Sequence, residues 1–72
     1  MIRGMKLTIN GEPRVLAGRE SLSVAALLDD LGMTGKPVAV ELNRELVFQR
    51  NHADTRLRDG DHVEIVTMVG GG

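Results

Sequence analysis

Residues 59–72 read DGDHVEIVTMVGGG, and this stretch decides the fold. It begins with Asp59-Gly60-Asp61, which is typical of a turn, and continues as an apolar, β-branched run from Val63 to Val69. Three glycines follow this run directly. The stretch therefore predicts a strand that leads, without a linker, into an end that carries no side chains.

The beginning of the chain predicts a neighbour for that strand. Residues 5–9 alternate apolar and polar side chains, as a half-buried strand does, and Asn10-Gly11 is a strong signal for a hairpin turn. The returning strand contains residues 15–17, and Pro13 favours an edge position for it, because proline has no amide hydrogen to donate. We expect the last strand to pair in parallel with residues 5–9 at the centre of the sheet.

A helix is predicted over residues 24–31. Four apolar side chains occupy positions i, i+3, i+4 and i+7 and so share one helical face: Val24, Leu27, Leu28 and Leu31. Ser23, or alternatively Ser21, can accept a hydrogen bond from a free amide at the N-terminus of this helix. Gly32 stands where a left-handed residue ends many helices.

Two further strands are predicted after the helix, over residues 38–42 and 46–48, with a turn at Asn43-Arg44 between them. Residues 56–58 are expected to form a brief bridge. The whole order predicts an α+β protein with the β-grasp arrangement of ubiquitin, in which a single main helix covers one face of a mixed sheet. We expect an N-terminal extension at residues 1–4, the β-grasp domain at 5–69 and a flexible glycine tail at 70–72.

Composition argues against several classes of partner. The 72 residues carry 9 basic and 10 acidic side chains and a net charge of -1, which gives no reason to expect nucleic acid or a membrane surface. No apolar run approaches the roughly 20 residues that span a bilayer, and the charged N-terminus does not resemble a signal peptide. Cysteine is absent, which suits the cytoplasm.

No side chain in the sequence is a good candidate for catalysis. His52 and His62 lack metal-ligand spacing and a nucleophile to activate, so both are expected at the surface. No glycine-rich stretch lies between a strand and a helix, as a phosphate-binding loop requires. The chain is therefore expected not to be an enzyme, and to bind no metal or cofactor by itself.

The glycine end predicts a different kind of chemistry. Gly70 and Gly71 can thread a narrow channel in another protein and present the carboxylate of Gly72 there. That carboxylate is ionised at neutral pH and is a poor electrophile. It must be activated, most simply as an adenylate, before a sulfur nucleophile can displace AMP and leave a thiocarboxylate. The glycines taken alone are equally compatible with a frayed end.

The last strand also predicts a docking surface. If Val63 and Ile65 face the helix, then Val66 and Met68 emerge on the open face of the sheet, with Ala39 beside them on the neighbouring strand. We expect these three residues, together with Val69 at the end of the strand, to contact a partner.

Four stretches of the sequence resemble the ThiS family of sulfur carriers in thiamine biosynthesis. They are residues 9–12, 24–31, 38–45 and above all 59–72, and the resemblance covers residues 5–72. Met68 stands where many relatives have phenylalanine, which keeps an apolar contact.

The resemblance implies a cycle with three partners. An E1-like adenylyltransferase of the ThiF type would use ATP and magnesium to adenylate Gly72. A donor system would supply sulfur derived from cysteine, and a thiazole synthase of the ThiG type would accept it. The alternatives are a molybdopterin-synthase small subunit, a ubiquitin-like modifier of lysines, and an interaction domain with an inert tail.

Overall fold

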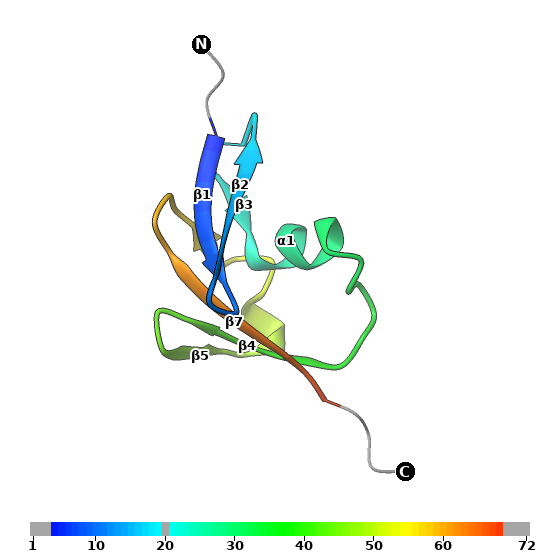
Figure 1. Ribbon diagram of the computed structural model, residues 1–72. Helices are drawn as coiled ribbons and strands as arrows, with labels where there is room; N and C mark the ends of the chain where they lie inside the picture. Colours follow the sequence, from blue (N-terminus) through cyan, green and yellow to red (C-terminus); the bar gives the residue numbers. More distant parts are fainter. Residues whose placement is uncertain (1–3, 20, 69–72) are drawn as a thin grey trace.

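The structure is a computed structural model that describes residues 4–19 and 21–68. The elements follow one another as β1 (Gly4–Ile9), β2 (Glu12–Ala17), β3 (Leu22–Ser23), α1 (Val24–Asp30), β4 (Val38–Leu42), β5 (Glu45–Val47), the 3₁₀ helix η1 (Gln49–Asn51), β6 (Arg56–Leu57) and β7 (His62–Thr67). Figure 1 shows α1 beside a strongly twisted sheet, with β7 crossing its centre.

Five strands form the main sheet in the order β2-β1-β7-β4-β5. The pair β1–β7 is parallel, and the other three pairs are antiparallel. The mixed sheet, its single α-helix and the parallel pairing of the first and last strands confirm the predicted β-grasp fold. β2, which contains Pro13, lies at an edge as predicted.

The turns and caps follow the local sequence. Asn10 and Gly11 take positive φ angles of 52° and 82°, the backbone that a tight hairpin turn needs. The hydroxyl of Ser23, rather than that of Ser21, accepts a hydrogen bond from the amide of Ala26 at 3.0 Å and so caps α1. Gly32 ends this helix with a φ of 72°.

The core lies between α1 and one face of the main sheet. It consists of ten buried apolar residues drawn from both sheets and the helix: Met5, Leu7, Leu22, Val24, Leu27, Leu28, Val40, Leu57, Val63 and Ile65. Alternate residues of β1 and β7 enter this core, so the other residues of these strands lie on the opposite, open face.

A second, two-stranded sheet was not predicted. β3 pairs antiparallel with β6, and Leu22 lies opposite Leu57, both of them buried. Two residues are too few to show a period of two, so no sequence pattern indicates β3.

Several element boundaries also differ from the predicted ones. β1 begins at Gly4, and β7 spans His62–Thr67 rather than 63–69. Residues 1–3 and 69–72 lie outside the described residues. In the described ranges, no helix combines the length and apolar composition that membrane spanning requires.

Candidate docking and transfer site

The predicted transfer site falls mostly beyond the described residues. Gly70, Gly71 and Gly72, together with Val69, lie outside them, so their predicted roles stay predictions. What the structure describes is the strand that leads into them, β7, and the neighbours that hold this strand in place.

The turn that starts β7 is built by its carboxylates. One oxygen of Asp59 accepts a hydrogen bond from the amide of Lys6 at 2.7 Å, and one oxygen of Asp61 accepts from the amide of Arg58 at 2.8 Å. Both side chains thus stabilise the main chain, as expected of a turn. Among the described residues, no group of three acidic, histidine or cysteine side chains could hold a metal ion.

Two asparagines hold the first half of β7 from either side. The Asn10 side chain accepts from the amide of Ile65 at 2.7 Å and donates to its carbonyl oxygen at 3.1 Å. On the other side, the Asn43 side chain accepts from the amide of His62 at 2.9 Å. Both asparagines stand in turns with positive φ angles, of 52° and 50°. The register of β7 is therefore fixed by side chains as well as by its neighbouring strands.

The end of β7 and the residue after it, Met68, expose apolar side chains on the open face. Val66 and Met68 are 60% and 52% exposed, and Ala39 of β4 lies directly opposite Val66 and is half-buried. Val63 and Ile65, which alternate with them, are buried. The predicted placement of these residues is confirmed, and we name Ala39, Val66 and Met68 the tail-proximal patch.

The patch continues onto β5, which the sequence analysis missed. Leu46 pairs with Glu41, and Glu41 shares the open face with Ala39, so Leu46 lies on that face too. Leu46 and Phe48 are 56% and 51% exposed, and the guanidinium of Arg50 stacks 4.9 Å from the centre of the Phe48 ring. The alternation of exposed Leu46 and Phe48 around Val47 was the available signal.

The prediction that both histidines lie at the surface is wrong for His52, which is only 7% exposed. Its Nε2 lies 3.1 Å from the carbonyl oxygen of Val47, so the ring links the residue that follows η1 to the end of β5. This contact depends on how the loop folds back, which no local pattern reveals. His62 is exposed, as predicted.

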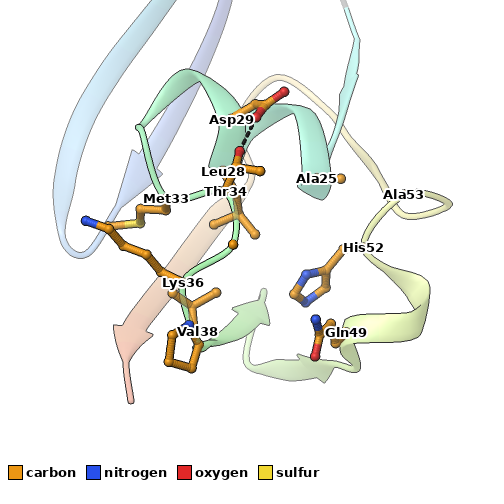
Figure 2. Close-up of a pocket in the computed structure, with 12 residues that line it drawn as sticks. Ala25, Leu28, Asp29, Met33, Thr34, Lys36, Val38, Gln49, His52 and Ala53 are labelled. Carbon is orange, nitrogen blue, oxygen red and sulfur yellow. Dashed lines mark hydrogen bonds between the residues drawn. The ribbon is translucent and has the colours of Figure 1, made fainter. Parts of the chain in front are cut away.

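An open pocket of about 530 Å³ lies on the helix side of the protein, between the residues that follow α1 and η1. Figure 2 shows His52 and Gln49 on one side of it and Met33, Thr34 and Lys36 on the other. Thr34 donates a hydrogen bond to Asp29, and His52 is engaged with Val47. Three of the polar lining side chains, those of Asp29, Thr34 and His52, thus already make contacts within the fold.

Comparison with known proteins decides the family. The model of the ThiS family matches residues 7–72. The chain belongs to the ThiS family. This match includes β7 and the glycines after it.

Individual ThiS relatives agree over nearly the whole chain. A protein named sulfur carrier protein ThiS from Thermus thermophilus is 42% identical over 64 residues, which cover 89% of this chain and 95% of that protein. The crystal structure of the thiamine biosynthesis protein ThiS from Geobacter metallireducens superimposes with a TM-score of 0.84 at 42% identity. That superposition covers 94% of this chain and 100% of the other.

One relative is much longer than this chain. A thiazole synthase from Paramagnetospirillum magneticum is 47% identical over 68 residues, which cover 94% of this chain but only 20% of that protein. The chain thus spans about a fifth of the length of this relative. A segment similar to this ThiS-family chain is therefore part of a protein named for the synthase.

Proposed function

We propose that this protein is the sulfur carrier for thiazole formation in thiamine biosynthesis, with Gly72 as the attachment point. One observation carries the proposal: β7, at the centre of a β-grasp sheet, is followed after only two residues by three glycines, in a chain that matches the ThiS family through residue 72. The carrier supplies an acyl group and a recognition surface, and its partners supply the catalysis.

The chemistry begins with activation of the terminal carboxylate. A carboxylate oxygen of Gly72 attacks the α-phosphorus of ATP, pyrophosphate leaves, and an acyl adenylate forms. An E1-like adenylyltransferase of the ThiF type, with magnesium, catalyses this step. Cysteine-derived sulfur, delivered at the oxidation level of hydrosulfide, then attacks the acyl carbon, a carbon–sulfur bond replaces the carbon–oxygen bond to AMP, and the carrier ends in a thiocarboxylate with no change of oxidation state.

Thiazole synthase is the proposed acceptor of the sulfur. The support comes from the thiazole synthase relative, in which a segment similar to this chain is joined to the synthase. Joining two proteins in one chain raises the effective concentration of each for the other, which is useful when they must meet. We place all of these steps in the cytoplasm.

The tail-proximal patch, together with Val69, is the proposed docking surface for these enzymes. Exposed apolar side chains gathered at one end of a sheet favour a protein contact over a purely structural role. Because Val66 and Met68 lie at and just after the end of β7, a partner docked on them would have its active site close to the glycines. Gly70 and Gly71 would then pass through the channel that leads to it.

Intact-mass spectrometry tests the proposal. The full chain is incubated with ATP, magnesium, the cognate adenylyltransferase and a cysteine-derived sulfur source. The expected product is heavier by the difference between one sulfur and one oxygen atom. An unchanged mass would contradict the carrier assignment, and an adduct to a lysine of another protein would indicate a modifier.

A chain that lacks Gly71 and Gly72 provides the matched variant. We expect it to fold as the full chain does, because the described core ends at Ile65, and to gain no sulfur. Circular dichroism checks its folding and intact mass checks its reaction. A truncated chain that still accepted sulfur would show that the attachment point is not Gly72.

A further inference from the structure

The two edges of β7 differ at its C-terminal end. On the β4 side, pairing continues to the end of the strand: Val38 lies opposite Thr67, and the amide of Met68 donates to the carbonyl oxygen of Pro37 at 2.8 Å. On the β1 side, pairing stops where Ile9 lies beside Val63. In Figure 1, β7 runs on past the end of β1.

On the β1 side, the Asn10 side chain extends the main-chain hydrogen bonding of β7 from Val63 to Ile65. The Asn10 main-chain amide donates to the carbonyl oxygen of Val63 at 2.9 Å, and its side-chain amide then engages both main-chain groups of Ile65. Beyond Asn10 the chain turns away into β2. No later residue of the hairpin continues along β7 in the described part of the chain.

Thr67 is the next residue of β7 on that side. Main-chain groups of a strand point alternately to its two edges. Asp61, Val63 and Ile65 bond toward β1, and Met68 bonds toward β4. The N–H and C=O groups of Thr67 therefore face the β1 side, where residues 4–19 and 21–68 place no strand.

We propose that an extended main-chain segment of thiazole synthase adds to the sheet beside Thr67 as a short extra strand. Unpaired N–H and C=O groups on a strand edge recognise extended backbone and little else. The choice of thiazole synthase as the partner rests on the proposed function. The choice of an extended segment rests on the N–H and C=O groups of Thr67 that face the open edge. Such a strand would hold the end of β7 from both edges, just before the glycines in the sequence.

The side chains around this edge fit the same partner. Val66 and Met68, which flank Thr67, are exposed on the open face. An added strand would place its own apolar side chains on that face, next to the tail-proximal patch. Main-chain pairing then supplies direction, and the patch supplies apolar contact area.

Hydrogen–deuterium exchange, read at single amides by fragmentation mass spectrometry, tests the pairing in the full chain. In the free carrier, the Thr67 amide should exchange faster than those of Ile65 and Met68, which are bonded to Asn10 and Pro37. Saturation with thiazole synthase should slow Thr67 by at least about tenfold, as formation of a stable hydrogen bond requires.

Calorimetry on the same samples measures whether the complex forms, and so separates a failure of strand addition from a failure of the proposed partner. A complex that forms while the Thr67 amide exchanges as fast as in the free chain would overturn strand addition and leave the carrier function standing. Failure of any complex to form would contradict thiazole synthase as the partner, and with it this inference.

Thr67→Pro offers an independent check, with Thr67→Val as its control. Proline is tolerated in strands where the N–H would face an open edge, so the thermal midpoint should change little. Thr67→Pro should weaken binding to thiazole synthase about tenfold, since it removes one interfacial hydrogen bond. Thr67→Val keeps the N–H and should bind as the native chain does. Equal affinity of both variants would overturn the inference.

Discussion

The two halves of β7 are built differently, although they belong to one strand of six residues. The first half, through Ile65, has neighbours on both edges: β1 and Asn10 on one side, β4 and Asn43 on the other. The second half, Val66 and Thr67, pairs only with β4 among the described residues, and Met68 just after it bonds to Pro37 just before β4. Its apolar side chains face outward, whereas Val63 and Ile65 are buried.

This difference separates the part of the strand that stabilises the core from the part that we propose meets the partner enzymes. The first half anchors the strand in the core, and the second half presents apolar surface and an open edge next to the glycines. A carrier needs both properties, because its reactive end must be accessible to several enzymes while its fold stays fixed. The predictions below run from the largest expected change in the free energy of unfolding to the smallest.

Replacing Ile65 should have the largest effect. Ile65→Ala removes buried methyl groups from the core and should lower the free energy of unfolding by about 2–5 kcal/mol. The neighbouring Val66→Ala should change it by less than about 0.5 kcal/mol, because Val66 is exposed. Urea unfolding measures both, and similar losses for the two variants would contradict the division of β7 into halves.

Removing the Asn10 side chain should have an intermediate effect. Asn10→Gly keeps the positive φ of the turn but loses both hydrogen bonds to Ile65. The free energy of unfolding should therefore fall by about 1–3 kcal/mol. Arg44→Gly is the control, since Arg44 also has a positive φ, of 72°, but an exposed side chain. The control should keep its stability or gain some. Equal losses from the two variants would show that Asn10 matters only for the turn.

Charging the tail-proximal patch should affect binding far more than folding. Val66→Asp or Met68→Asp should weaken binding to thiazole synthase by at least about tenfold, or about 1.4 kcal/mol, by placing a charge in an apolar contact. The change in unfolding free energy should stay within about 0.5 kcal/mol. Calorimetry measures the affinity for thiazole synthase, and urea unfolding measures the free energy of unfolding.

Val15→Asp is the matched control for this pair. Val15 is 66% exposed and lies opposite Lys6 on the edge strand β2, away from β7. The Val15→Asp variant should bind thiazole synthase as tightly as the native chain does. An equal loss of affinity for Val15→Asp, or a large drop in stability for Val66→Asp, would contradict a docking role specific to the patch.

The sequence predicts the main sheet and the exposure of the patch because both follow from local patterns. The period of two in β7 assigns Val63 and Ile65 to one face and Val66 and Met68 to the other. Asn10-Gly11 and Gly32 predict turns at their own positions, because few other residues accept the positive φ angles that these turns require.

What the sequence does not predict depends on contacts between distant segments. Asn10 bonds to Ile65, 55 positions away, and no spacing within one element indicates such a pair. The burial of His52 and the pairing of β3 with β6 arise in the same way. The roles of Gly70 to Gly72 were inferred from their lack of side chains and from the ThiS resemblance, and they stay predictions because these residues lie outside the described ranges.

The most direct test of the central claim is a semisynthetic chain whose Gly72 ends in a carboxamide instead of a carboxylate. It is compared with the native chain in a reconstituted mixture of adenylyltransferase, sulfur donor and thiazole synthase, and thiazole phosphate is measured. The account predicts a native fold and no product, because an amide cannot be adenylated. Thiazole phosphate formed at the native rate by the amidated chain would contradict it.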